Sequence, residues 1–362
     1  MVAPMKLFTC ENCQQTLYFE NNSCVSCGEA VGYCPESARL LVLSKPENTG
    51  VRLCANAGQQ ACNWLVTADS NAEFCNSCAL SEIIPDLSDP ANNAAWRRIE
   101  AAKRRLLYTL YALRLPVTSR EQDTEQGLSF HFLKGTEEKP VMTGHDDGII
   151  TLNVDEADFA FRENMREKMG EGYRTVLGHL RHEIGHYYWD RLIADAGKLD
   201  LFRGCFGDES ASYEEALERH YKFGPHPNWG EWFISAYASM HPWEDFAETW
   251  AHYLHMVDTL ETARSHGLTL RAQATNKTGE RVATERLEFF DFESLAIGWN
   301  AVTLAMNSLN RSMGMKDAYP FVLTQAVLGK LRFIHELILA QRKNGDMFDY
   351  RQGTSPGQEA AA

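Results

Sequence analysis

The chain has 362 residues, of which 44% are hydrophobic and 23% charged, enough for one large or two moderate cores together with small modules. Its formal net charge of -14 argues against a general nucleic-acid-binding protein, because binding to phosphates depends on clustered Lys and Arg. Residues 1–9 lack the apolar run of a signal peptide, and no later stretch has the roughly 18 uninterrupted apolar residues of a membrane helix. We therefore expect a cytoplasmic protein without a membrane segment.

The cysteines are concentrated at the start of the chain, where nine of the ten precede residue 80. In a reducing compartment this favours metal binding over disulfides. Two C-x-x-C pairs, with ten residues between them and a glycine after the second, are typical of a zinc ribbon, since each tight turn offers two thiolates to one ion. We predict a ribbon over residues 1–32 with the ligands Cys10, Cys13, Cys24 and Cys27. A disulfide framework and a rubredoxin-like iron site are the alternatives.

A second cysteine-rich zinc module is predicted over residues 33–82. It contains five cysteines for four ligand positions, and Cys34 is the farthest from any paired cysteine. The predicted ligands are Cys54, Cys62, Cys75 and Cys78. Cys34 could instead replace Cys54 or be a buried thiol, and the isolated Cys205 is expected in the core. Because so short a segment buries little apolar surface, metal binding should provide much of its folding free energy.

The first 80 residues are acidic, with four Lys or Arg against seven Asp or Glu. Protein recognition, or packing on the rest of the chain, is therefore favoured over nucleic-acid binding. Two prolines and several turn formers at residues 83–90 indicate the start of the main domain, predicted over residues 83–343. A helix is expected over residues 94–115, where Pro116 ends it. One side of this helix is basic, with Arg97, Arg98, Lys103, Arg104 and Arg105. We predict that this side faces solvent; the alternative is a docking surface for the acidic ribbons or for a partner.

Alternating and turn-bounded patterns predict three strands over residues 128–133, 140–145 and 149–154. We expect a small antiparallel sheet, whose edge strand could pair with an extended substrate backbone. His131 and His145 lie in these strands, but sequence alone does not assign either as a ligand. A polar amphipathic helix is predicted next, over residues 156–170.

An H-E-x-x-H array lies in the following predicted helix, residues 173–194. Residues four apart lie one above the other on a helix, so His182 and His186 can offer two imidazoles to one metal ion while Glu183 faces its bound water. Apolar residues recur at helical spacing around this array, and no proline interrupts it. Such a short motif also occurs by chance on solvated helix faces, so it requires a third ligand.

The third ligand is predicted on a later helix that begins at Pro242, where a missing N–H costs little. Glu244, Glu248 and His252 follow on one face by steps of four residues. Buried acids need a cationic partner, and zinc held by two histidines and one carboxylate is such a partner. We favour Glu244 as the ligand and Glu248 as the residue that orients a ligating histidine. Asp245 and Glu248 are rival ligands, and a helix whose acids only face solvent is the remaining alternative.

Between these two helices we expect a loop over residues 200–209 and a helix over residues 212–223. Hydroxyl and imidazole groups in this region are candidate donors to a tetrahedral intermediate; they are Tyr213, Tyr221, Tyr237 and His241. Two long apolar helices are predicted over residues 291–309 and 319–343, followed by a disordered tail over residues 344–362.

The sequence resembles the bacterial family of zinc-binding metallopeptidases with an N-terminal zinc ribbon. The matching stretches include Cys62–Val66, Ile84–Leu87, Gly178–Asp190, His241–Asp245 and Ala247–Tyr253. The resemblance implies an α+β, zincin-like and mainly helical catalytic domain with a small antiparallel sheet, preceded by the two zinc modules. From the ligand sets above we expect zinc as the cofactor, with one catalytic and two structural ions. The resemblance supplies no substrate.

The predicted function is zinc-dependent hydrolysis of peptide bonds, with Glu183 as the general base that takes a proton from a zinc-activated water. The expected partner is a peptide or protein substrate, with a possible protein partner at the ribbons and neither nucleic acid nor membrane. Two alternatives remain: a non-catalytic regulatory or adaptor protein with a latent peptidase fold, and a metal-dependent amidase acting on non-protein substrates.

Overall fold

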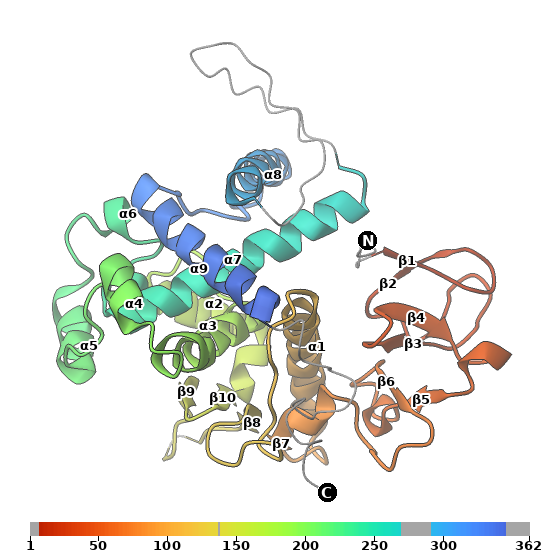
Figure 1. Ribbon diagram of the computed structural model, residues 1–362. Helices are drawn as coiled ribbons and strands as arrows, with labels where there is room; N and C mark the ends of the chain where they lie inside the picture. The colour runs from red at the N-terminus through yellow and green to blue at the C-terminus, as the bar shows by residue number, and fades with distance from the viewer. Residues whose placement is uncertain (1–6, 137, 269–290, 345–362) are drawn as a thin grey trace, which may run out of the picture. The chain divides into compact units, whose positions relative to one another are not determined.

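The computed structural model describes residues 7–136, 138–268 and 291–344 (Figure 1). The chain forms two compact units. Of the described residues, the first comprises 7–136, 138–165, 175–187 and 340–344, and the second comprises 166–174, 188–268 and 291–339. Apart from residue 344, the tail predicted over 344–362 lies outside the described residues. Within the described residues, no helix combines the length and apolar composition that crossing a bilayer requires.

The first unit begins with three small antiparallel hairpins. They are β1 (Leu7–Thr9) with β2 (Thr16–Tyr18), β3 (Val31–Cys34) with β4 (Arg39–Val42), and β5 (Val51–Leu53) with β6 (Leu65–Thr67). Tyr33 of β3 lies in an aromatic cluster, with ring centroids 4.9 Å from Phe19 and 5.2 Å from Trp64. Phe19 also contacts Tyr108 of the next helix, at 5.0 Å. This apolar contact attaches the hairpins to the helix that follows.

Helix α1 (Pro90–Ala112) starts where the side chain of Asp89 accepts a hydrogen bond from the Ala91 N–H and Pro90 takes the first helical position. The prediction of a solvated basic face is wrong for Lys103 and Arg104, which are both buried. Arg104 donates to the carbonyl oxygen of Ala61. The alternative prediction is confirmed within this unit, because α1 docks the hairpin region.

Charged and polar contacts at the exposed edge of the same surface complete the docking. Arg105 forms an ion pair with Glu20 at 2.5 Å. Arg97 donates to the side-chain oxygen of Gln60 at 2.9 Å. An acidic residue of the hairpin region, Glu20, therefore has a basic partner on α1. Helix α1 lies between the hairpins and the four-stranded sheet in Figure 1.

That sheet has the order β7-β8-β10-β9, with β7 (Ser81–Ile83), β8 (Ser129–Leu133), β9 (Gly144–Asp146) and β10 (Ile149–Asn153). The prediction of a wholly antiparallel sheet is wrong, because only β9 and β10 pair antiparallel, whereas β8 is parallel to both β7 and β10. The cause is the connection after β8, which carries the chain past β10 before a tight turn returns it. Asp147 and Gly148 form this turn with φ of 43° and 85°.

The second residue of this turn, Gly148, cannot be replaced by a residue with a side chain without strain. A Cβ on Gly148 would lie 2.5 Å from the Gly127 carbonyl oxygen and 2.6 Å from that of Gln126. Glycine at 148 therefore meets both the positive φ and the close approach of the strand connection.

Helices α2 (Phe159–Met169) and α3 (Val176–Trp189) follow, and α3 continues as a π-helical turn over Asp190–Ala194. In the second unit, the loop predicted over residues 200–209 is wrong, because α4 occupies Leu199–Phe206. Phe202 and Phe206 are one helical turn apart, stack with ring centroids 5.2 Å apart, and both contact Phe246. Burial of these rings outweighs the helix-weakening effect of Gly204.

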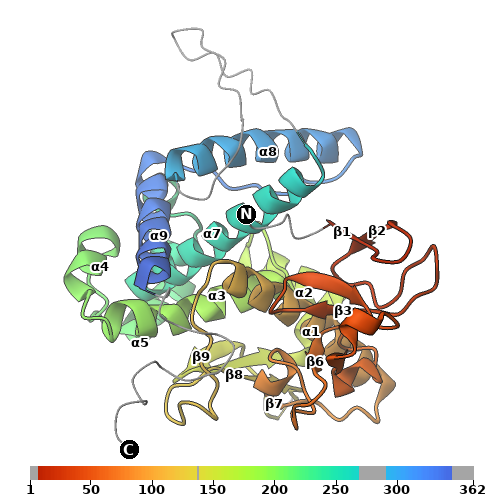
Figure 2. The ribbon, with the colours of Figure 1, turned by 45° about the vertical axis from the view of Figure 1, so that its right-hand side comes forward.

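The remaining helices of the second unit are α5 (Tyr213–Phe223), α6 (Trp229–Trp232), α7 (Pro242–Ser265), α8 (Phe292–Ser312) and α9 (Gln325–Asn344). Figure 2 shows α8 and α9 against α7. Helix α9 begins later than the predicted residue 319, because Pro320 disfavours helical backbone at Tyr319 and the Thr324 side chain caps the helix by accepting from the Val327 N–H at 3.3 Å. Tyr253 of α7 and His335 of α9 are joined by a buried hydrogen bond of 2.9 Å.

His335 predicts a pH dependence of stability. Burial lowers its pKa below the ordinary value of 6.5, so the unfolded chain binds more protons in the window between the two values. Stability from this residue is complete above about pH 6.5 and decreases as the pH falls toward the lowered pKa. In His335→Gln, which keeps a partner for Tyr253, the fall in melting temperature between pH 7.5 and 5.5 should be smaller than in the wild type. An equal fall would contradict the assignment.

Candidate metal centres

The first cysteine cluster joins the four sulfurs of Cys10, Cys13, Cys24 and Cys27, which lie within 4.8 Å of one another. The Sγ atoms of Cys10 and Cys27 are 3.8 Å apart, and those of Cys13 and Cys24 are 3.6 Å apart. Four thiolates arranged tetrahedrally at about 2.3 Å from zinc would be about 3.8 Å apart. The donor set and its spacing therefore fit a zinc ion. The Glu29 N–H lowers the pKa of Cys27 to about 6, which favours the thiolate form that zinc requires.

The second cluster joins Cys54, Cys62, Cys75 and Cys78, all of them buried. The sulfurs of Cys62 and Cys75 are 3.6 Å apart. Two backbone N–H groups donate to these sulfurs at 3.3 Å, from Trp64 to Cys62 and from Cys75 to Cys54. Such donors stabilise negative charge on sulfur, so this cluster also fits zinc.

Cys34 lies outside both clusters. It ends strand β3, packs with Leu41 and Leu65, and its thiol donates to the carboxylate of Glu36 at 3.2 Å. Burial raises the pKa of this thiol, which favours the protonated form. The structure thus brings Cys54, and not Cys34, together with the other three cysteines.

The difference in exposure predicts two rates of zinc release. Cys13 of the first cluster is exposed, whereas all four cysteines of the second are buried. Mixing the wild-type protein with excess coloured chelator should give a faster phase from the first cluster. The matched variants Cys13→Ser and Cys75→Ser should each remove a different phase, the fast one for Cys13→Ser. Loss of the slow phase in Cys13→Ser would contradict this order.

The H-E-x-x-H array forms a third cluster on α3. The Nε2 atoms of His182 and His186 face each other at 3.1 Å, and both lie within 4.8 Å of the Glu183 carboxylate. Two imidazoles bound tetrahedrally at about 2.0–2.1 Å from zinc would place these atoms about 3.3–3.4 Å apart. The separation and the donor atoms fit two ligands of one ion. Glu183 is buried beside them, where a carboxylate can act on a water at the same ion.

His145 of β9 lies next to this pair without joining the cluster. Its ring stacks with that of His186, with centroids 6.3 Å apart, and its Nε2 accepts a hydrogen bond from the Gly148 N–H at 3.1 Å. His131 of β8 is engaged elsewhere, 3.0 Å from the carboxylate of Glu82. The structure therefore gives neither histidine the place of a third ligand in this cluster.

The predicted third-ligand residues lie on α7 in the second unit, whereas the histidine pair lies in the first. Glu244 is 2% exposed and accepts a hydrogen bond from the Tyr213 hydroxyl at 2.7 Å. Glu248 accepts one from the Ser235 hydroxyl at 2.6 Å. Both acids are thus oriented by neutral donors, which leave their negative charge in place.

Asp245 differs from its two neighbours. Lys330 of α9 donates to its carboxylate at 2.6 Å, so a cation already neutralises this acid. Its burial nevertheless raises its pKa to about 7, because desolvation exceeds the attraction of the ammonium group. Asp245 is therefore the weakest of the three candidates for a zinc ligand.

His252, the third member of the predicted polar face, has a structural partner. Its Nδ1 is hydrogen-bonded to the Tyr319 hydroxyl at 2.7 Å, and its ring contacts that of Phe321 edge to face at 4.4 Å between centroids. Of the three residues spaced four apart on α7, Glu244 and Glu248 are thus carboxylates held by hydroxyl groups, whereas His252 is packed against aromatic rings.

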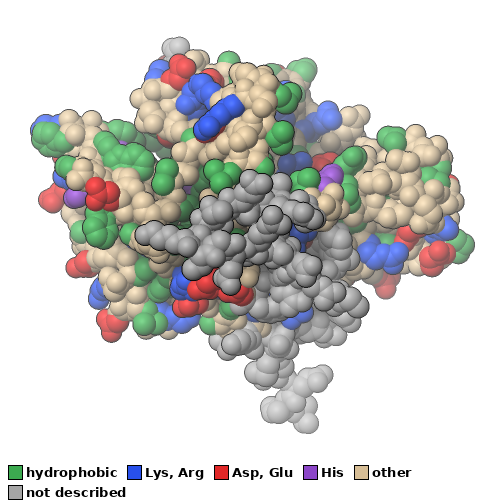
Figure 3. All heavy atoms as spheres, turned by 90° about the horizontal axis from the view of Figure 1, so that it is seen from above, with side chains coloured by type: hydrophobic (Ala, Val, Ile, Leu, Met, Phe, Trp, Pro, Cys, Tyr) green, Lys and Arg blue, Asp and Glu red, His purple; other side chains and the backbone are tan. Residues whose placement is uncertain are grey.

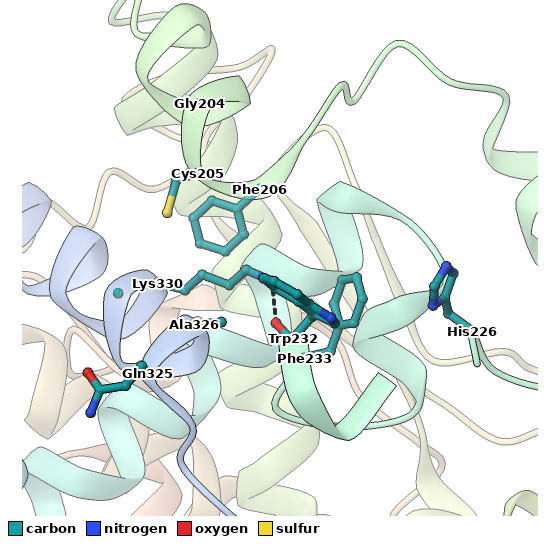
Figure 4. Close-up of a pocket in the computed structure, with 10 residues that line it drawn as sticks. Gly204, Cys205, Phe206, His226, Trp232, Phe233, Gln325, Ala326 and Lys330 are labelled. Atoms are coloured by element: carbon teal, nitrogen blue, oxygen red, sulfur yellow. Dashed lines mark hydrogen bonds between the residues drawn. The ribbon is translucent and has the colours of Figure 1, made fainter. Parts of the chain in front are cut away.

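A cavity of about 600 Å³ in the second unit is lined by residues of α4 and α9 and by the segment around α6 (Figure 4). Lys330 lies in its wall and donates to the carbonyl oxygen of Trp232 at 2.8 Å, while its ammonium group lies 4.2 Å from the centre of the Phe233 ring. Sequence reasoning missed this lysine. The only indication in the sequence was a lysine within an apolar helix. Such a lysine can equally well extend its ammonium group to solvent, so the pattern does not predict a buried ion pair.

On the face seen in Figure 3, the described basic side chains are interspersed with acidic ones and do not form an extended basic patch. This distribution fits the net charge of -14. It gives no support to a phosphate-binding surface on that face.

Cysteine clusters in small hairpins together with an H-E-x-x-H helix define a class of zinc-binding proteins. The chain belongs to the family described as "Putative zinc-binding metallo-peptidase", whose model matches residues 92–337, and residues 7–89 match a zinc-ribbon domain. The resemblance predicted from sequence is therefore confirmed.

Three relatives, two from strains of Mycobacterium tuberculosis and one from Mycobacterium bovis, are each 45% identical over 335 residues. The matched region covers 92% of this chain and 95% of each relative. All three carry the name "uncharacterized protein". No solved structure matches the chain.

Proposed function

We propose that the chain is a zincin-like, zinc-dependent metallopeptidase that hydrolyses peptide bonds with Glu183 as general base. The observation that carries this proposal is the convergence of two imidazole Nε2 atoms, 3.1 Å apart, beside a buried carboxylate on the same helix. This arrangement gives one ion two ligands and places a base next to it. Membership of a zinc-binding metallopeptidase family supports the same reading.

Glu244 is the proposed third ligand. Lys330 already neutralises Asp245, whereas a neutral hydroxyl holds each of Glu244 and Glu248. Of these two acids we assign the ligand role to Glu244, in the first turn of α7, and the orientation of a histidine to Glu248. Within the second unit, the ring of Tyr188 at the end of α3 stacks on that of Trp250 of α7, with centroids 4.9 Å apart. Glu244 is six residues before Trp250 on that helix.

The residues divide the reaction between them. Bound zinc would supply Lewis-acid activation of a water and polarisation of the scissile carbonyl group. Glu183 takes the proton of the attacking water and then delivers it to the leaving amine. The eight cysteines of the two clusters take no part in hydrolysis and hold one structural zinc each.

A peptide or protein substrate is supported by the position of β9. This strand is an edge of the four-stranded sheet, and its His145 lies against the ring of His186. An edge strand can pair with an extended peptide along its outer side, next to the proposed metal. The cysteine clusters, which need reduced thiols, support a cytoplasmic location.

A substrate screen on the zinc-loaded protein tests this function. A peptide library and cell-wall fragments with non-protein amide bonds are incubated in parallel, each with and without a chelator. Chelator-sensitive cleavage of peptides is the expected result. Cleavage of the non-protein amides alone would favour an amidase, and no cleavage of either at full zinc occupancy would favour an adaptor role and contradict the proposal.

A further inference from the structure

Glu244 is held by a residue that comes from a different helix of the second unit. Tyr213 is the first residue of α5, and its hydroxyl donates to Oε1 of Glu244 at 2.7 Å. The carboxylate is 2% exposed, whereas the tyrosine is 36% exposed. A buried carboxylate needs hydrogen bonds that replace its lost hydration, and an O–H donor to an ionised acceptor is among the stronger ones.

The position of Tyr213 is itself fixed at both helix starts. The Ser212 side chain caps α5 by accepting from the Glu215 N–H at 3.3 Å. His241 caps α7 by accepting from the Trp243 N–H through Nδ1, and its Nε2 donates to the carbonyl oxygen of Ala211 at 3.0 Å. The starts of α5 and α7 are therefore joined by the His241–Ala211 hydrogen bond in addition to the Tyr213–Glu244 one.

Ring contacts restrict the tyrosine further. Its ring meets those of His241 and Trp243 edge to face, with centroids 5.4 and 5.9 Å apart. Tyr237, which is hydrogen-bonded to Tyr213, has a pKa raised chiefly by burial, with a further contribution from the charge of Glu244. Glu244 thus accepts a hydrogen bond from a neutral phenol, that of Tyr213, which orients it without cancelling its charge.

We propose that Tyr213 is a positioning residue that orients the Glu244 carboxylate for zinc binding. The inference rests on the proposed function, in which Glu244 is the third ligand. It replaces the sequence-based prediction that Tyr213 donates to a tetrahedral intermediate, because its hydroxyl proton is already directed to Oε1. Lys330 provides the contrast, since it holds the adjacent Asp245 by cancelling its charge.

The test measures zinc affinity at the histidine site by competition with a chelator. Tyr213→Phe keeps the ring and removes the hydroxyl, and residues of this kind typically change metal affinity about 10–100-fold. We expect such a loss at the histidine site and none at the two cysteine clusters. The matched control is Phe223→Leu on the same helix, which is 74% exposed and should bind zinc as the wild type does.

Two further variants make every outcome informative. Tyr213→Leu removes the ring as well, and its affinity should resemble that of Tyr213→Phe if the hydroxyl is responsible. Glu244→Gln should weaken zinc binding at least as much as Tyr213→Phe. If Glu244→Gln binds zinc normally, the ligand assignment is wrong and the inference fails with it. If Glu244→Gln is weakened but Tyr213→Phe binds as the wild type does, only the role of Tyr213 is overturned.

Discussion

Replacement of Glu183 by Gln should reduce peptide hydrolysis by about 10²–10⁴-fold, the range that a general base contributes. Gln has nearly the same shape but cannot accept the proton of the attacking water. Zinc content should stay at the wild-type value, because the ligands His182 and His186 are untouched. The measurement is the rate of cleavage of a responsive peptide together with zinc analysis of the same sample.

Glu167→Gln provides the matched control, since Glu167 is an exposed acid on α2. This variant should retain wild-type activity. An unchanged rate in Glu183→Gln would reject Glu183 as the base. Loss of zinc together with activity in Glu183→Gln would instead assign Glu183 to metal binding.

Replacement of Lys103 by Met should destabilise the first unit by about 3–5 kcal/mol, the typical result of removing one partner of a buried ion pair. Lys103 and Glu100 are fully buried, and their charged groups are 3.0 Å apart. Lys103 also donates to the Ser81 hydroxyl, three residues after Cys78. Burial raises the pKa of Glu100, so this acid depends on the cation beside it. Chemical denaturation monitored through the first unit provides the measurement.

The double variant Lys103→Met with Glu100→Leu separates the pair from its packing. Because neither charge remains buried, most of the lost stability should return. Arg98→Met on the same helix is the control, as Arg98 is exposed and should change stability by no more than about 0.5 kcal/mol. A single Lys103→Met variant as stable as the wild type would show that the buried pair contributes nothing.

Local signals predicted much of the fold. Pro242 correctly predicted the start of α7, and the hydrophobic spacing around the H-E-x-x-H array predicted α3. Both signals depend only on residues close in sequence. The cysteine spacing likewise indicated the two groups of four that the structure brings together. These features need no knowledge of distant contacts.

Features that depend on distant residues were not predicted. From the sequence, Lys103 is predicted to lie on a solvated basic face. In the structure it contacts Ser81, and its ammonium group lies 5.5 and 5.6 Å from the ring centres of Phe130 and Phe132. The parallel pairing of β8 with β10 depends on the route of the connection between them. The neutralisation of Asp245 required a lysine 85 residues further along the chain.

Anomalous diffraction at the zinc edge, from crystals of the zinc-loaded protein, tests the proposed metal centre most directly. The account predicts one peak within each cysteine cluster and one bonded to Nε2 of His182, Nε2 of His186 and a carboxylate oxygen of Glu244. A peak at the histidine pair whose third protein ligand is another residue would contradict the assignment of Glu244. The absence of any peak there would contradict the proposed enzyme.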